Sequence, residues 1–408
     1  MMLNKYYRNS HAYGFSLVEL MVGLVIGLIA TLVISQTFSV FEGQKRTTTG
    51  VSDTQTNGTI ALYNVMRDAQ MAGFGLPFLD KTNPPMTCSP VPTINHDNNA
   101  TTPAIDLFPV VITDGGAAAG ASDQVALRYS FTYTPPALAD RRKVLIGGVP
   151  TDFPSNPGVS VEIINPLSAT TTGVTVHNNR GCQNGDVALA SKFNKTSGIN
   201  ACALFKVTAT NAVLDADTTK IKLNAVIPVL PHSYINGSLS CLGRWNEITY
   251  RVNGNKELER GGQPYADNDP TPANRGLPNA AFVPNVAGVV NIQAQYGVST
   301  NAQDNQISNW VDASGAWLNP TFADKVKIKA IRVAIVARSG LLEKENVTGA
   351  CTTAQGTVNN GPCAWDDAGL DPAPKIDLSD DANWRRYRYR VYETIIPIRN
   401  IAWARGNL

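Results

Sequence analysis

A single carboxylate lies inside a long apolar run near the start of this chain of 408 residues. From Phe15 to Ser35 only Glu19 carries a charge, and the run is close to the ~20 apolar residues that an α-helix needs to cross a bilayer. An ionisable side chain in such a run is costly and by default has a functional role and a partner. The spacing Gly14-Phe15-x-x-x-Glu19 is therefore the first candidate site.

The flanks of this run predict how the chain crosses a membrane. Lys5 and Arg8 precede it, and no acidic residue comes before Glu19. The positive-inside tendency then puts residues 1–14 in the cytoplasm and everything after about residue 40 in the periplasm. A cleaved signal peptide fits poorly, because its apolar middle is ~7–15 residues long and a small-x-small site follows it. A plain signal anchor explains the length and the flanks but not Glu19.

Sequence signatures of catalysis and metal binding are missing. There is no GxSxG, no HExxH and no phosphate-binding glycine loop. No CxxC exists and the four histidines are scattered, so a zinc site is not expected. Asp366-Asp367-Ala368-Gly369-Leu370-Asp371 lacks the full EF-hand pattern, and a solvated turn is favoured over a calcium site. We expect neither enzymatic activity nor a cofactor.

The six cysteines predict disulfides. Their number is even and they lie on the presumed periplasmic side, where oxidation favours disulfides over thiols. Cys351 and Cys363 are the preferred local pair, because they would close a small loop. Cys182–Cys202 is a reasonable second pair and Cys88–Cys241 the remainder, although six cysteines allow many connectivities.

A basic and aromatic stretch at 384–399 is a second candidate site. Alternating arginines and tyrosines are compatible with contact to DNA. The favoured interpretation is an ordinary strand with the arginines on one face, so nucleic acid is not a favoured partner. The arginines are Arg385, Arg386, Arg388 and Arg390, the opposite face is Tyr387, Tyr389 and Val391, and Tyr392 follows.

One long helix is expected to position Glu19. Residues 15–41 form its membrane-spanning half and 42–75 its second half, in which apolar residues follow the spacing of one buried face. Residues 43–58 are rich in weak helix formers, so fraying or bending is expected there. The buried face comprises Leu62, Val65, Met66, Ala69 and Gly73, and Gly73, Gly75 and Pro77 end the helix.

Residues 76–280 are predicted to be a loop-rich β region. Short candidate strands alternate with Pro, Asn and Gly turn signals. Asn253-Gly254 predicts a tight hairpin turn into 256–260. The candidate strands are a short one within 105–112 and then 124–133, 159–164, 173–177, 186–191, 201–209, 220–226 and 245–252.

Residues 281–408 contain the most strongly patterned runs. Those at 286–298, 325–338 and 384–399 are expected to form an antiparallel sheet packed on the second half of the helix. The expected fold class is α+β, a long N-terminal helix packed on an antiparallel β-sheet domain with a large loop-rich β insertion.

The spacing of Gly14, Phe15 and Glu19 resembles the processing site of type IV prepilins. The resemblance implies that a prepilin peptidase removes residues 1–14 as a leader and that Phe15 becomes a methylated amino terminus. The new ammonium would lie one helical turn from Glu19. In a bundle of helices, Glu19 would instead meet the amine of a neighbouring subunit, because an unpaired charge in hydrocarbon is penalised.

The chain as a whole resembles large minor pilins of the PilW type, on the leader, the helix through 67–75 and the runs at 289–298, 331–338 and 392–400. The resemblance implies a pilin-like scaffold without enzymatic activity that helps to start pilus assembly in a tip complex. Its partners would be other minor and major pilins, prepilin peptidase, the inner membrane and the pilus assembly platform. The chain would sit in the inner membrane with a periplasmic carboxyl-terminal domain, and then in the pilus.

Two other functions remain open. The large minor pseudopilin of type II secretion shares the amino-terminal features, and a tip adhesin or DNA-binding subunit would bind through the loops of 76–280 or the basic stretch. A tethered periplasmic enzyme is least favoured. Because 15–70 contains no proline, unlike the buried helix of many major pilins, the abundant structural subunit is disfavoured.

Overall fold

A computed structural model describes Gly14 and residues 16–74, 107–131, 143–146, 149–152, 160–163, 173–176, 187–194, 199–207, 213–214, 221–226, 234–261, 282–365 and 371–399. The chain divides into two compact units, Met1–Asp53 and Thr54–Leu408.

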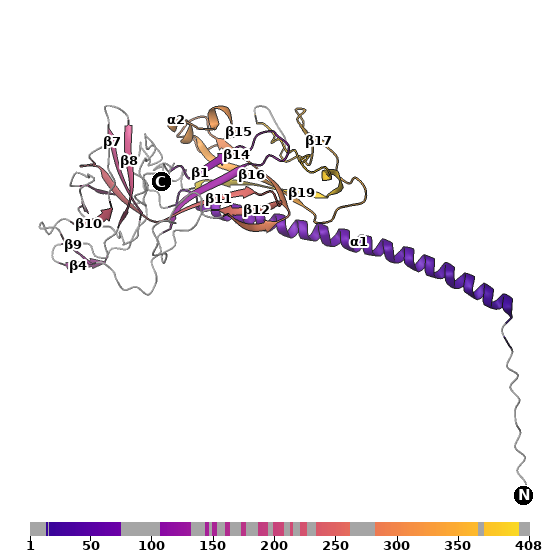
Figure 1. The fold of residues 1–408 in the computed structure, drawn as a ribbon. Coiled ribbons are helices and arrows are strands. Elements are labelled where there is room, and N and C mark those ends of the chain that lie inside the picture. The colour runs from indigo at the N-terminus through magenta and orange to yellow at the C-terminus, as the bar shows by residue number, and fades with distance from the viewer. Residues whose placement is uncertain are drawn as a thin grey trace, which may run out of the picture. The chain divides into compact units, whose positions relative to one another are not determined.

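The amino-terminal helix α1, Leu17–Met71, is 55 residues long and belongs to both units (Figure 1). It is continuous through residues 43–58, so the expected fraying is absent there. Threonine hydroxyls in and next to this segment bond to the helix itself: Thr48 Oγ1 donates to Gln44 O at 2.9 Å and Thr59 Oγ1 to Gln55 O at 2.8 Å. Polar side chains that could compete with the backbone are thus satisfied within the helix.

Small side chains form the face of α1 that is buried in the second unit. Val65 and Ala69 are buried as expected, whereas Leu62 and Met66 lie at the margin of the core. Gly58 lets α1 lie close to β19, because a Cβ at this position would lie 2.0 Å from the Tyr392 ring. The buried face is Thr54, Gly58, Ala61, Val65, Asp68 and Ala69.

The strands confirm the predicted β content. Each candidate strand overlaps an observed one, although 245–252 is only the second half of a longer strand. In the β region the strands are β1 Val110–Thr113, β2 Gln124–Phe131, β3 Lys143–Ile146, β4 Val149–Asp152, β5 Ser160–Glu162, β6 Gly173–Val176, β7 Val187–Asn194, β8 Ile199–Val207, β9 Val213–Leu214, β10 Ile221–Val226, β11 Ser238–Val252 and β12 Glu257–Gly261. In the carboxyl-terminal region the elements are β13 Val283–Ala287, β14 Val289–Val298, β15 Asn309–Asp312, η3 Gly315–Trp317, α2 Phe322–Lys325, β16 Ile328–Arg338, β17 Cys351–Thr352, β18 Val358–Asn359, η4 Trp384–Arg386 and β19 Tyr389–Pro397.

Two antiparallel sheets dominate the described part of the second unit. The larger runs β1-β2-β11-β7-β8-β10-β6, with β12, β13, β5 and β9 attached at its sides. β11 changes partners along its length, from β5 and β7 at its start to β2 and β12 after an irregularity between Cys241 and Gly243. The smaller sheet runs β15-β14-β16-β19, and β17-β18 and β3-β4 are separate hairpins. This sheet contains the three predicted carboxyl-terminal strands.

One hydrophobic core joins α1 to both sheets. Side chains of α1, of β1, β2, β11 and β12, and of β14, β16 and β19 all contribute to it. Tyr296 of β14 links the sheets directly, since its hydroxyl accepts the Ile112 N–H of β1 at 2.6 Å. The expected packing of the carboxyl-terminal sheet on the helix is confirmed, and so is the α+β class.

Two of the predicted strands are shorter in the structure than expected. The run 286–298 divides at Gly288, whose φ of 75° suits glycine and lets β13 pair with β12 while β14 pairs with β16. The run 384–399 begins with the 3₁₀ turn η4, and its strand starts only at Tyr389. In both cases unbroken side-chain patterning continued across a change in backbone direction.

The predicted hairpin between β11 and β12 is present with a different turn. The positive φ expected near Asn253-Gly254 occurs at Lys256, with φ 60°. Asn253 explains this, because its side-chain oxygen accepts the N–H groups of Asn255 at 2.9 Å and Glu257 at 3.0 Å. The asparagine side chain closes the turn in place of a glycine conformation.

Candidate functional site

Glu19 lies in the first turn of α1, and Ser16 closes that turn. The Glu19 N–H donates to Ser16 Oγ at 3.1 Å, and the Leu20 N–H donates to Ser16 O at 3.1 Å. Ser16 is therefore the N-cap, and Ser16-Leu17-Val18-Glu19 has the spacing of a capping box. Sequence reading had overlooked Ser16, although its S-x-x-E signature was available.

The Glu19 carboxylate is exposed and makes no hydrogen bond or ion pair within the part of the chain that the structure describes. Gly14 is exposed and lies outside the helix. Phe15, the third member of the predicted site, falls outside the described residues. A partner for the Glu19 charge therefore has to come from elsewhere than the described residues.

The surface around Glu19 is a bare apolar helix. All side chains from Ser16 to Arg46 are exposed, and Leu17 and Phe38 are 76% and 73% exposed. The helix is long and apolar enough to cross a membrane, with a window of mean hydropathy 2.7, none of it buried within the chain. Such a surface in water would be strongly unfavourable, so it needs lipid or another apolar surface against it.

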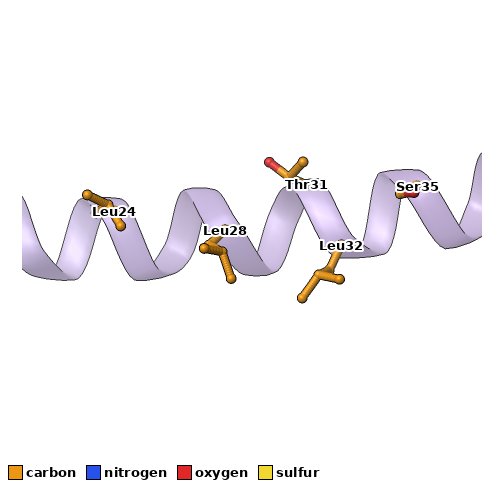
Figure 2. A pocket seen from close by; sticks show the side chains of 5 residues that line it. All are labelled: Leu24, Leu28, Thr31, Leu32 and Ser35. Carbon is orange, nitrogen blue, oxygen red and sulfur yellow. The ribbon is translucent and has the colours of Figure 1, made fainter.

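A shallow groove runs along this helix (Figure 2). It is lined by Leu24, Leu28, Thr31, Leu32 and Ser35. One helix alone forms it, so it is a packing surface and not an enclosed ligand cavity. Thr31 Oγ1 donates to Gly27 O at 2.8 Å. The hydroxyl is therefore hydrogen-bonded within the helix even in apolar surroundings.

A buried carboxylate, Asp68, fastens the other end of α1. It is 4% exposed. Its Oδ2 accepts the Tyr250 hydroxyl of β11 at 2.7 Å and Arg260 Nε of β12 at 3.0 Å, and its Oδ1 accepts Arg67 Nη2 at 3.1 Å. Burial and then the Asp68 charge raise the pKa of Tyr250, so this hydroxyl stays a donor at neutral pH. The cluster holds the helix to the β11–β12 hairpin, and its buried carboxylate is already bonded to groups of the chain.

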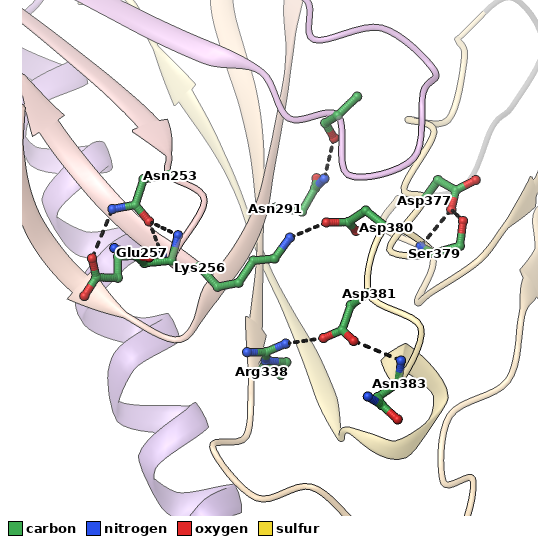
Figure 3. Close-up of polar contacts among 12 residues, drawn as sticks. Asn253, Lys256, Glu257, Asn291, Arg338, Asp377, Ser379, Asp380, Asp381 and Asn383 are labelled. Atoms are coloured by element: carbon green, nitrogen blue, oxygen red, sulfur yellow. Dashed lines mark hydrogen bonds and ion pairs between the residues drawn. The ribbon is translucent and has the colours of Figure 1, made fainter.

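A second group of polar contacts joins distant loops of the second unit (Figure 3). Lys256 Nζ of the β11–β12 turn meets Asp380 Oδ2 at 2.6 Å, and Arg338 Nη1 at the end of β16 meets Asp381 Oδ2 at 3.0 Å. Asn291 Nδ2 donates to Ala121 O at 2.6 Å. The two ion pairs tie the segment before β19 to both sheets. Its carboxylates are thus occupied within the chain.

Arg332 is a buried cation on the face of the small sheet away from α1. Its guanidinium lies 4.9 Å from the Trp310 ring centre and 4.3 Å from that of Trp365. It donates to Gln295 Oε1 at 2.6 Å and to Pro372 O at 3.1 Å. Burial lowers its pKa to about 10, so it stays charged at neutral pH. The stacked rings and the carbonyl make this a structural anchor.

The acidic stretch 366–371 falls largely outside the described residues. Asp371 is described, and its Oδ1 accepts the Trp310 N–H at 2.7 Å. Within the described ranges, no group of three or more His, Cys, Asp or Glu side chains could hold a metal ion.

The basic stretch does not form a single stripe. Arg385 and Arg386 lie in η4, before the strand begins. Arg388 pairs with Glu343 at 2.9 Å, and Arg386 donates to Glu343 O at 2.8 Å. Arg385 stacks on Trp384, 5.2 Å from the ring centre. Arg390 lies 6.0 Å from the Tyr392 ring centre. The expected alternation therefore holds only within β19, and each of the four arginines contacts another residue of the chain.

The predicted disulfide between Cys351 and Cys363 is present, with a Cα–Cα distance of 5.7 Å. It closes the loop that holds the β17–β18 hairpin. Cys202 is also disulfide-bonded. Cys88 and Cys182 lie outside the described residues, as does the side chain of Cys241, so the pairs Cys182–Cys202 and Cys88–Cys241 stay predictions.

Two stretches of the chain match known protein families. Residues 9–35 match the prokaryotic N-terminal methylation motif, which includes Gly14, Glu19 and the start of α1. Residues 277–400 match PilW, type IV pilus-assembly protein W, over the span of β13 to β19. The resemblance to PilW-type minor pilins is thus confirmed over 277–400, and the resemblance to the prepilin amino terminus over 9–35.

Among solved structures, a type IV-like pilin from Thermus thermophilus is similar to the chain. It is 14% identical, with a TM-score of 0.21, and the match covers 54% of this chain and 87% of that one. A TM-score this low leaves the fold to be judged from the chain's own elements. No curated protein matches the chain.

Proposed function

We propose that the chain is a minor pilin that is cut after Gly14, methylated at Phe15 and built into a type IV pilus, where it helps to start assembly at the tip. Its role is structural and not enzymatic. The observation that carries the proposal is the Glu19 carboxylate, which has no partner among the described residues and lies on a bare apolar helix, in a chain that matches both the methylation motif and PilW.

The first unit supplies the assembly surface. Lys5 and Arg8 keep the leader cytoplasmic, so the second unit would lie in the periplasm before assembly. Cutting ahead of the apolar run leaves α1 on the mature chain and places an ammonium at Phe15. In hydrocarbon an unpaired charge is expensive, so Glu19 selects positions where such an amine from its own or a neighbouring chain is in reach.

The second unit supports a minor and not a repeating subunit. It is large, and its polar contacts are used within the chain, as the Asp68 and Lys256 pairs illustrate. The match to PilW supports a pilus over the type II secretion machine. The proposed partners are other minor and major pilins, prepilin peptidase and the assembly platform. The engagement of Arg386 and Arg388 within the chain argues against DNA as the principal ligand.

Replacement of Glu19 by glutamine tests the pairing. The Glu19→Gln chain should remain in the membrane and lose its leader, but it should be depleted in sheared pili at least ten-fold relative to the parent. Glu42→Gln is the matched control, because Glu42 is also exposed on α1 and lies beyond the apolar run. Pili that contain the Glu19→Gln chain at the parent level, or an equal loss for Glu42→Gln, would overturn the proposal.

A further inference from the structure

Two exposed cations, Lys45 and Arg46, follow the apolar run of α1. Neither side chain makes a hydrogen bond or ion pair with the part of the chain that the structure describes. Glu42 is the other charge between Ser35 and Arg46, and it pairs with neither cation among the described residues. This stretch of the helix therefore keeps a net positive charge that the described chain does not neutralise.

Exposed aromatic rings precede these cations on the helix. Phe38 and Phe41 are both exposed. They lie three residues apart and Lys45 comes four residues after the second ring, so the three side chains share one face of α1. Aromatic rings, followed by basic side chains whose apolar stems lie along lipid, are typical of the boundary between a bilayer and water.

The length of α1 places these residues at such a boundary. At about 1.5 Å per residue the helix rises about 32 Å from Leu17 to Phe38, close to the ~30 Å thickness of the hydrocarbon core. From Leu17 to Lys45 it rises about 42 Å, which matches the ~40–45 Å of a bilayer with its headgroups. A helix that crosses the membrane from its first turn therefore brings both cations to the phosphates of the far leaflet.

We propose that two rings and two cations of α1 form a headgroup belt, which binds acidic phospholipids of the periplasmic leaflet through their phosphates. The belt consists of Phe38, Phe41, Lys45 and Arg46. Its rings contact the upper part of the acyl chains, and its cations donate hydrogen bonds to phosphate oxygens, which a guanidinium can do through two N–H groups at once. This inference rests on the proposed residence of the chain in the membrane before assembly, and it adds the class of lipid that α1 binds there.

The test is native mass spectrometry of the full chain in mild detergent, with phosphatidylglycerol and phosphatidylcholine of the same acyl chains offered in equal amounts. The parent should retain phosphatidylglycerol in preference to phosphatidylcholine. The chain with both Lys45→Gln and Arg46→Gln should retain about five-fold less phosphatidylglycerol, because each basic residue near an anionic surface adds to the attraction. A large excess of inorganic phosphate should not displace the lipid.

The matched control removes the same two kinds of charge from the second unit. It carries Lys344→Gln and Arg390→Gln, at exposed positions outside α1, and it should retain as much phosphatidylglycerol as the parent. Equal retention of the two lipids by the parent would overturn the headgroup belt, and so would an unchanged Lys45→Gln and Arg46→Gln chain or an equal loss in the control. Displacement by inorganic phosphate would also overturn it, because the site would then bind free phosphate.

The same spectra separate this inference from the function on which it rests. The mass of the parent, purified from membranes that contain prepilin peptidase, shows whether residues 1–14 have been removed. A mass that still includes them contradicts the proposed function, whichever lipid is retained. A processed parent without a preference for phosphatidylglycerol contradicts the headgroup belt alone.

Discussion

At the scale of single residues, two carboxylates on α1 have opposite surroundings. Glu19 is exposed on an apolar surface without a described partner, whereas Asp68 is buried with three donors around it. A charge of the first kind seeks a partner outside the described residues, and one of the second kind is fixed within the chain. The two ends of one helix are thereby assigned to assembly and to folding.

Replacement of Asp68 tests the second assignment. Asp68→Asn leaves Arg260 without its counter-ion in a half-buried position, so the free energy of unfolding should fall by about 3 kcal/mol. Tyr250→Phe removes one hydrogen bond to a charged group and should cost about 1–2 kcal/mol. Urea unfolding of the detergent-solubilised chain measures both. Asp53→Asn, an exposed position on the same helix, should change stability by less than about 0.5 kcal/mol, and an equal loss there would contradict the account.

The pH dependence of stability should report Asp123. Burial raises the pKa of Asp123 from 3.8 to about 7, against the N–H groups of Gly115 and Ala294, which bind its carboxylate and lower the pKa. The neighbouring charges of Asp114 and Asp312 raise it further. The folded chain therefore keeps this proton up to about pH 7, while the unfolded chain loses it near 3.8. The contribution is full below about pH 4 and is lost as the pH rises to 7.

Urea unfolding from pH 4 to pH 8 checks this sign. Asp123→Asn should be less sensitive to pH between 4 and 7 than the parent, by up to a few kcal/mol over that range. Its absolute stability will also be lower, because an amide can accept only one of the two N–H groups. Identical slopes for the two chains would show that the group is ionised in the folded protein throughout this range.

At the scale of elements, close packing of α1 depends on small residues. Gly58 faces the Tyr392 ring, and the Tyr392 hydroxyl donates to Thr54 O at 3.3 Å. The strand β19 can thus lie directly against the helix. This contact joins the last strand of the chain to its first helix, and it fixes where the small sheet meets α1.

Gly58→Ala should destabilise the chain although alanine is the better helix former. The added Cβ would lie 2.0 Å from the ring, and such overpacking costs about 1–3 kcal/mol. The gain in helix propensity offsets about 1 kcal/mol of this cost. Gly43→Ala is the matched control, since a Cβ there meets nothing within 4 Å, and it should be neutral or slightly stabilising. If both variants unfold at the same urea concentration, the close contact is not present in solution.

The sequence predicted elements with local signals better than their tertiary partners. The apolar run, the 3/4 spacing of 62–69 and the alternating strands at the carboxyl end each carry their own pattern, and all are present. Asp68 could not be paired from the sequence, because Tyr250 and Arg260 lie 182 and 192 residues away. The cap at Ser16 was not predicted, because its S-x-x-E signal overlaps the Gly14-Phe15-x-x-x-Glu19 motif.

At the scale of the whole molecule, one chain combines two units whose surfaces suit different surroundings. The first unit exposes an apolar helix suited to lipid or to other helices, whereas the second encloses its core between α1 and two sheets. The two units share α1, so substitutions in the two halves of the helix should affect different measured properties. Substitutions in the first half should alter assembly, and those in the second half should alter stability.

Mass spectrometry of the amino-terminal peptide of the natural protein tests the central claim most directly. The account predicts a mature chain that begins at Phe15, with its amine carrying one methyl group. A protein that still begins at Met1 or Met2, or that starts downstream of residue 35, would contradict it, because Glu19 would then lack the neighbouring amine or the chain would lack the helix that carries it.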